Sequence, residues 1–165
     1  MEVIVNTALD WGIGKDGDLL YHIREDMKFF RQHTLGKAVL MGRKTLESFP
    51  GGKPLPDRVN IVLTANPDYQ KDGVVVCHSA EEALALTRQY PEVMLIGGAA
   101  VYEQFLPYCE RAWVTRVQAS KPADTYFPDL DELEQWECVW TSEKHQAGEV
   151  EFYFTEYVNH AVKAV

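Results

Sequence analysis

The sequence predicts a single α/β domain built on a mostly parallel sheet. Over about the first two-thirds of its 165 residues, short apolar runs typical of buried strands alternate with segments of helical periodicity. Such alternation favours a central, mostly parallel, eight-stranded sheet flanked by about four helices. Helical periodicity is missing from the last third, where we expect an antiparallel C-terminal edge strand. Residues 1–160 should form the domain, and residues 161–165 a frayed tail.

The expected elements follow from apolar runs bounded by Gly, Pro and Asn. Strands are expected at 3–9, 38–41, 59–63, 74–77, 93–96, 112–117, 137–143 and 151–158. Helices are expected from Ile23 onward and over 45–49, 80–89 and 99–106. Ser79 should cap the third of these helices, because Glu82 follows three residues later as in a capping box. Residues 10–20 should form a long loop.

Composition and charge limit the possible partners. The formal net charge is −9, and nucleic acids and membrane surfaces are themselves anionic, so we expect neither as a partner. The three cysteines, Cys77, Cys109 and Cys138, form no CxxC pair and are expected to be reduced and mostly buried. The histidines show no metal-ligand spacing, so no metal site is expected. With no signal peptide before Glu2 and no apolar run of membrane-spanning length, we expect a cytoplasmic protein.

The helix from Ile23 carries a candidate proton donor. On a helix, Ile23, Met27 and Phe30 share one apolar face, and Asp26 lies between them. Burial disfavours the ionised form of a carboxyl group and raises its pKa towards the range useful for proton transfer. The alternative is an ordinary acid in the first helical turn, favoured by the helix dipole. These residues alone leave both interpretations open.

The loop that precedes this helix contains the segment GIGKDG, which matches the pattern GxGxxG. A dinucleotide fingerprint requires a helix to begin within the motif, and none is expected here. Asp10, Asp16 and Asp18 would also repel phosphate. We therefore interpret the glycines as giving conformational freedom to a mobile lid, with an ordinary surface loop as the alternative.

Two strand-to-helix junctions suit phosphate groups better. VLMGRKT opens a helix with Arg43 and Lys44, and MLIGGAAVY places Gly97 and Gly98 between a strand and a helix. Free N–H groups at a helix start and small residues beside them allow a phosphate to approach the backbone. Together the junctions favour a dinucleotide along the carboxyl ends of the strands. The two cations favour NADP over NAD, although they could simply be a solvated helix start.

Arg58 is a candidate for carboxylate binding. It follows a rigid Pro-Leu-Pro turn, which would hold the guanidinium in place for bidentate binding. An arginine that faces solvent is the commoner case.

Six segments then reveal a family resemblance. The chain resembles bacterial dihydrofolate reductases over residues 1–158, through GIGKDGDL, REDMKFF, LMGRKTLESF, KPLPDRVNIVLT, VMLIGGAAVYEQFLP and DTYFP. The resemblance implies NADPH-dependent reduction of 7,8-dihydrofolate to 5,6,7,8-tetrahydrofolate in a monomer that antifolates inhibit. Hydride would pass to C6, and Asp26 would bind the pterin amino group and N3 and promote protonation of N5 through a water. The resemblance thus favours the catalytic interpretation of Asp26.

The resemblance also implies particular site residues. The substrate pocket would comprise Ile4, Asn6, Asp26, Met27, Phe30, Phe49, Leu55, Arg58, Ile96 and Thr115. Arg58 would hold the glutamate α-carboxylate, Thr115 would bond to the acid from behind, and Leu19 and Tyr21 would join Asp26 in catalysis. The NADPH site would comprise Asn6, Ile13, Gly14, Lys15, Asp16, Gly17, Asp18, Leu19, Gly42, Arg43, Lys44, Thr45, Leu63, Thr64, Ala65, His78, Ile96, Gly97, Gly98, Ala99, Ala100, Val101 and Tyr102. The family has a cis peptide at the glycine pair, where glycine at both positions is physically apt.

Some residues depart from the family pattern. Leu20-Tyr21 replaces the usual Pro-Trp, whose tryptophan helps to hold a water near the acid. Asn6 replaces an alanine, while Ala99 and Ala100 replace a glycine and a frequent arginine, leaving more of the NADPH contact to Arg43 and Lys44. His22, four residues before Asp26, is interpreted as a loop residue facing water.

Two other functions remain as alternatives. A riboflavin-pathway pyrimidine reductase of the same fold would need a phosphate site in place of Phe30, Phe49, Leu55 and Arg58. A non-catalytic NADPH-binding protein would explain the change at Tyr21, but it would not need Asp26.

Overall fold

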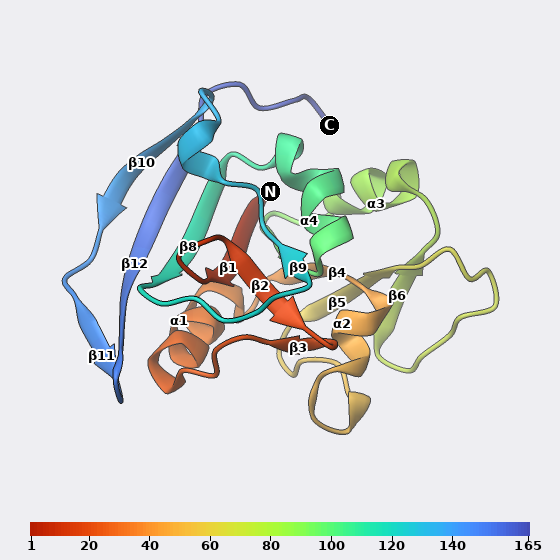
Figure 1. Ribbon diagram of the computed structural model, residues 1–165. Helices are drawn as coiled ribbons and strands as arrows, with labels where there is room; N and C mark the ends of the chain where they lie inside the picture. The colour runs from red at the N-terminus through yellow and green to blue at the C-terminus, as the bar shows by residue number, and fades with distance from the viewer.

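Apolar, β-branched runs form the strands of one nine-stranded sheet in the computed structural model, which describes residues 1–165 (Figure 1). The strand order is β10-β12-β8-β1-β7-β4-β5-β6, and β11 pairs with β12 beside this path. The bounds are β1 Glu2–Thr7, β4 Ala38–Gly42, β5 Val59–Leu63, β6 Val74–Cys77, β7 Val93–Gly97, β8 Arg111–Val117, β10 Trp136–Thr141, β11 His145–Ala147 and β12 Val150–Asn159.

The pairing confirms a mostly parallel sheet with antiparallel strands from the end of the chain. β1 pairs in parallel with β7 and β8, β4 pairs in parallel with β5 and β7, and β6 runs parallel to β5. β12 runs antiparallel to β8, β10 and β11. The carboxyl ends of the parallel strands therefore meet at one edge of the sheet, the lower edge in Figure 1.

Helices cover both faces of the sheet, as predicted. They are α1 Arg24–Thr34, α2 Arg43–Glu47, α3 Ala80–Thr87 and α4 Ala99–Phe105, with 3₁₀ turns η1 Pro50–Gly52, η2 Leu106–Tyr108 and η3 Leu130–Glu132. Alternate strand residues face opposite ways. Val3, Leu40 and Leu95 thus join the core beneath α3 and α4, whereas Ile4, Val39 and Met94 join the core beneath α1 and α2. Ser79 caps α3 by accepting from the Glu82 N–H, at 3.1 Å.

None of the helices is long and apolar enough to cross a lipid bilayer.

The buried face of α1 differs from the one predicted. Ile23 is the extended N-cap residue rather than part of the helix, and Met27 is 64% exposed. Phe29 packs inward instead, stacked on Phe154 of β12 with ring centroids 4.2 Å apart, and it also meets Trp113 of β8 edge-on. Which face of α1 is buried depends on the direction from which the sheet packs against the helix. The spacing of apolar residues along the sequence gives no information about that direction.

The loop expected over residues 10–20 is also more ordered than predicted. β2 Gly12–Lys15 pairs with β3 Asp18–Leu19, and on its other side with β9 Thr125–Tyr126, which forms a second small sheet. Gly14 is required there, because a Cβ at this position would lie 2.8 Å from Thr125 Oγ1. The partner strand lies more than a hundred residues away in the chain, so local sequence could not predict this pairing.

Two smaller differences from the predictions concern the segment 145–149 and Cys138. The segment 145–149, expected to separate two strands, contains the short strand β11. Cys77 and Cys109 are buried as predicted, but Cys138 is exposed on the edge strand β10. Residues 161–165 carry no helix or strand.

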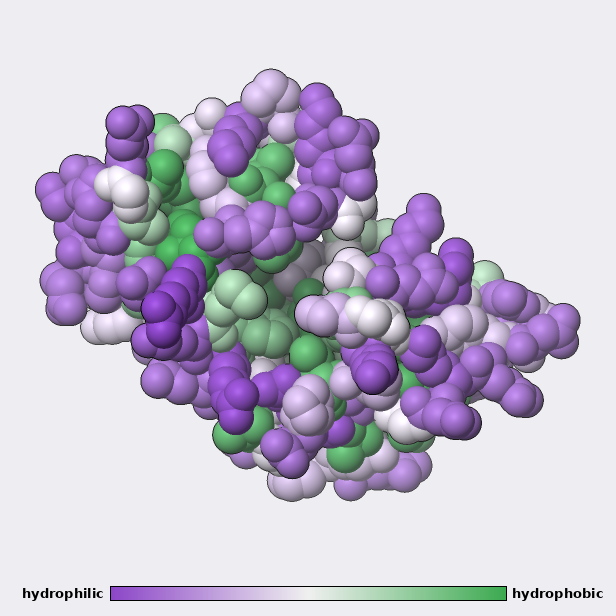
Figure 2. All heavy atoms as spheres, turned by 90° about the horizontal axis from the view of Figure 1, so that it is seen from below, coloured by the Kyte–Doolittle hydropathy of each residue, from purple (hydrophilic) through white to green (hydrophobic).

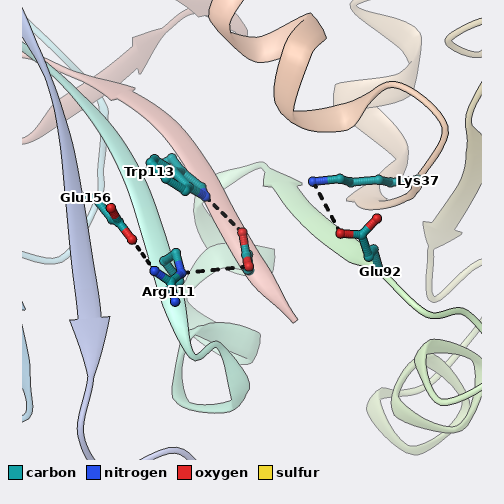
Figure 3. A network of polar contacts seen from close by, with 6 residues as sticks. Lys37, Glu92, Arg111, Trp113 and Glu156 are labelled. Carbon is teal, nitrogen blue, oxygen red and sulfur yellow. Dashed lines mark hydrogen bonds and ion pairs between the residues drawn. The ribbon is translucent and has the colours of Figure 1, made fainter.

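A polar network lies at the start of β1 and β8 (Figure 3). Trp113 Nε1 donates to Glu2 at 2.8 Å, and Arg111 pairs with both Glu2 and Glu156. These contacts tie β1, β8 and β12 together at the end of the sheet opposite to the carboxyl ends of the parallel strands.

Replacing Phe29 by alanine should destabilise the protein by about 3 kcal/mol, because the variant loses the aromatic stack between α1 and the sheet. The free energy of unfolding from urea titration measures the effect. Met27→Ala on the same helix is the matched control and should cost less than about 0.5 kcal/mol, since that side chain is exposed. Equal losses in the two variants would contradict this account of the α1 packing.

Candidate active site

The candidate site lies along the carboxyl ends of the parallel strands. β1 brings Asn6 to this edge, β4 brings Gly42, β5 brings Leu63, and β7 brings Gly97. Figure 2 views the molecule from below this edge and shows a central hollow with apolar residues in its floor and hydrophilic residues around its rim. Open α/β sheets bind ligands in such a position.

Asp26 is held at this edge by two hydrogen bonds. Thr115 of β8 donates its hydroxyl to Oδ1 at 2.5 Å, and Asn6 of β1 donates its side-chain amide to Oδ2 at 2.8 Å. Burial raises the pKa of Asp26 above its ordinary value, and the two hydrogen bonds oppose that rise. The carboxyl group is therefore fixed in position and has an elevated proton affinity, which suits proton transfer.

Apolar residues from four elements lie beside this acid. Ile4 and Ile96 come from β1 and β7, Phe30 from α1, and Phe49 and Leu55 from the segment around η1, and all belong to one cluster. The structure thus brings together five residues that the sequence analysis assigned to the substrate pocket. Met27, also assigned there, lies at the exposed rim.

Tyr21 and Leu19 do not bond to the acid in this structure. Tyr21 is buried in a separate cluster with Leu20, Ile23, Phe152 and others, and its hydroxyl has no hydrogen-bond partner. Leu19 is exposed, while the hydrogen bonds of Asp26 go to Asn6 and Thr115. Neither residue therefore forms a hydrogen bond with the acid in this structure.

Arg58 has an unused donor inside the protein. Its Nε is buried without a partner, and burial together with the nearby Arg31 lowers the pKa of its guanidinium. An unpaired buried donor is costly, so this group suits an anionic ligand that would satisfy it.

Asn60 holds the loop that carries Leu55 and Arg58, a role that the sequence analysis missed. Its side chain donates to Leu55 O at 2.9 Å and accepts from Leu55 N at 3.0 Å. It also donates to Arg58 O at 3.2 Å. A polar residue inside an apolar strand is the sequence feature that could have revealed it.

The turn between β7 and α4 approaches the turn between β4 and α2. The Gly97–Gly98 peptide is cis, as the family resemblance implied, and Gly97 has a φ of 125°. A Cβ on Gly98 would lie 3.6 Å from Thr45 Oγ1, so any larger residue would fill the space between the two turns. Neither Gly42 nor Gly98 supplies a side-chain cap to its helix, which leaves backbone N–H groups available to a phosphate.

Further along the same edge, His78 Nδ1 lies 2.9 Å from Thr64 O, which brings together the ends of β5 and β6. Arg43 donates to Glu47 at 2.8 Å, whereas Lys44 is exposed. The remaining members of the predicted cofactor set, Ala65, Ala99, Ala100, Val101 and Tyr102, follow β5 or lie on α4. Tyr102 is oriented by donating to Ile4 O at 2.8 Å.

The hairpin of β2 and β3 contains the residues predicted to form a lid. Ile13 and Gly14 are buried, whereas Lys15, Asp16, Gly17, Asp18 and Leu19 are exposed. Asp124, which the sequence analysis missed, accepts from Asp16 N at 2.9 Å and ties the lid tip to the segment before β9. His22 is exposed and pairs with Asp18 at 3.1 Å, as expected for a loop residue.

No group of three or more His, Cys, Asp or Glu side chains is arranged to hold a metal ion.

A parallel sheet with glycine-bounded turns beside a buried carboxyl group defines a nucleotide-dependent α/β enzyme. Residues 1–159 match the family model described as dihydrofolate reductase. A dihydrofolate reductase of Haemophilus influenzae is 43% identical over 135 residues, 82% of each chain, and dihydrofolate reductase type 3 of Salmonella typhimurium is 41% identical over 146 residues, 88% of each chain. The structure of Enterococcus faecalis dihydrofolate reductase complexed with NADP(H) and RAB-propyl superposes with a TM-score of 0.86 at 36% identity, covering 96% of this chain and 95% of that one. The chain belongs to the dihydrofolate reductase family.

Replacing Asn6 by alanine should raise the pKa of Asp26 further. The Asn6 amide favours the ionised carboxylate, so its loss leaves burial less opposed. NMR titration of the Asp26 carboxyl carbon measures the pKa directly. Thr115→Val, which removes the other donor, should shift the pKa in the same direction. An unchanged or lowered pKa in both variants would contradict this account of the acid.

Proposed function

We propose that this protein reduces 7,8-dihydrofolate to 5,6,7,8-tetrahydrofolate with NADPH as cofactor. The observation that carries the proposal is Asp26, which Asn6 and Thr115 hold by hydrogen bonds at the edge of the sheet where β7 ends in Gly97. Membership of the dihydrofolate reductase family and the likeness to a reductase complexed with NADP(H) support it.

The residues of the strand edge fit NADPH. The cis Gly97–Gly98 turn and the uncapped starts of α2 and α4 provide backbone donors without side chains in the way. Arg43, Lys44, Thr64 and His78 would hold the adenosine 2′-phosphate and adenine, with Arg43 exchanging its bond to Glu47 for the phosphate. When bound, NADPH supplies the hydride that reaches C6 of the pterin.

The chain's own residues bind the substrate and promote protonation of N5 of the pterin. Asp26 would accept hydrogen bonds from the pterin amino group and N3, which fixes the ring and promotes protonation of N5. Ile4, Phe30, Phe49, Leu55 and Ile96 would exclude water around the pterin and aminobenzoyl groups. Arg58 would bind the glutamate α-carboxylate through its unused donor.

The two alternative functions have weaker support. A riboflavin-pathway reductase would require a phosphate site where this chain places Phe30, Phe49 and Leu55 in one apolar cluster. A non-catalytic NADPH-binding protein would have no need of an acid fixed by two donors. NADPH oxidation measured with and without dihydrofolate separates all three functions.

The proposal also covers the domain bounds, the oligomeric state, the location in the cell and the inhibitors. Residues 1–160 would form one catalytic domain that works as a monomer in the cytoplasm, and antifolates would occupy the pterin pocket. Sedimentation in the presence of NADPH tests the monomer.

Asp26→Asn should lower turnover at neutral pH by roughly 10²–10⁴-fold, as expected for the loss of an acid–base group. The amide keeps the size of the side chain but has no acidic proton to direct to the pterin. Steady-state rates across pH measure the effect, and activity should partly return at low pH, where the substrate arrives already protonated. Wild-type turnover at neutral pH would exclude the role assigned to Asp26.

Arg58→Ala should weaken dihydrofolate binding by about 2–5 kcal/mol, because the substrate carboxylate loses a partly buried partner. Equilibrium fluorescence titration measures the affinity. A pterin without the glutamate is the control ligand and should bind the wild type and the variant equally. If the variant loses affinity for both ligands alike, Arg58 does not bind the carboxylate.

A further inference from the structure

Arg116 occupies an unusual position beside the candidate site. It follows Thr115 on β8, and because strand residues alternate, the two side chains leave opposite faces of the sheet. Thr115 points to Asp26, whereas Arg116 lies beneath the turn that joins β1 to the lid. No carboxylate pairs with the Arg116 guanidinium within salt-bridge distance.

The guanidinium of Arg116 contacts that turn through both of its terminal nitrogens. Nη1 donates to Ala8 O at 2.8 Å, and Nη2 donates to Leu9 O at 3.0 Å. The group also stacks on the indole of Trp11, with 3.8 Å from its central carbon to the ring centroid. Trp11 has a φ of 68°, a backbone conformation that side chains rarely adopt, so the stack helps to hold a strained turn.

The same guanidinium connects the turn to the acid. Nη1 also donates to Thr7 Oγ1 at 2.9 Å, and Thr7 in turn donates to Thr115 O at 3.2 Å. The Thr115 side chain then donates to Asp26. The turn and the acid are therefore joined through Thr115, whose backbone carbonyl accepts from Thr7 and whose hydroxyl donates to Asp26.

We propose that Arg116 is a positioning residue that fixes the lid hairpin relative to Asp26 during hydride transfer. The inference rests on the proposed function. A planar group with several donors can satisfy three acceptors and a ring face at once, which a lysine cannot do. Only four residues separate Thr7 from Gly12, so any movement of this turn passes directly into the lid.

The test compares Arg116→Met with Arg111→Met. Both residues lie on β8, but Arg111 contacts Glu2 and Glu156 at the other end of the strand (Figure 3). In Arg116→Met, single-turnover hydride transfer should slow by about tenfold or more, since small displacements of reacting groups are costly. The KM for dihydrofolate should change little, and amide hydrogen exchange at Ala8, Leu9 and Trp11 should accelerate. Arg111→Met should leave the transfer rate and these amides unchanged while lowering the melting temperature.

Arg116→Lys keeps the charge and is the variant to measure if Arg116→Met does not fold. It should recover only part of the rate of hydride transfer. Wild-type transfer and exchange in the Arg116 variants would overturn the proposal, as would equal losses in the Arg111 variant. If the unaltered protein fails to oxidise NADPH with dihydrofolate, the proposed function is wrong. The exchange comparison at Ala8, Leu9 and Trp11 still decides whether Arg116 holds the turn.

Discussion

The hydrogen bond from Thr115 to Asp26 depends on the pairing of β1 with β8. In that register Asn6 lies opposite Thr115, so two neighbouring strands present two donors to one carboxyl group from α1. Burial alone would raise the pKa of the acid without fixing the positions of its oxygens. The donors restore some of its acidity and fix both oxygens, which is what a group that directs a proton to one ring nitrogen requires.

Parallel strands explain why the other parts of the site converge. Every strand from β1 to β7 in the parallel portion ends at the same edge, and each is followed by a turn into a helix or loop. The turns after β4 and β7 approach each other, since a Cβ on Gly98 would be in van der Waals contact with Thr45 Oγ1 at 3.6 Å. The uncapped starts of α2 and α4 and the acid thus share one edge although they come from distant segments.

The lid is anchored more firmly than its glycine-rich sequence suggests. β2 pairs on both sides, Asp124 accepts from the lid tip, and Lys121 donates to Leu20 O at 3.0 Å while lying over the ring of Tyr21. With the contacts of Arg116, these interactions attach the β2–β3 hairpin to β8 and the segment after it. Tyr21, which departs from the residue that the family resemblance implies, packs with Phe152 and Phe154 of β12.

The sequence by itself determined the strand and helix alternation and the glycine turns, and it singled out Asp26 as a candidate acid. These features are local, because the periodicity of apolar residues, the positions of glycine and the spacing of charged residues can each be read from a short stretch of sequence. The tertiary structure alone decided that Phe29 rather than Met27 packs inward, that β2 pairs with β9, and that Asn6 bonds to Asp26. Each of these depends on the direction in which a distant segment arrives, and a side chain's neighbours along the chain carry no information about that direction.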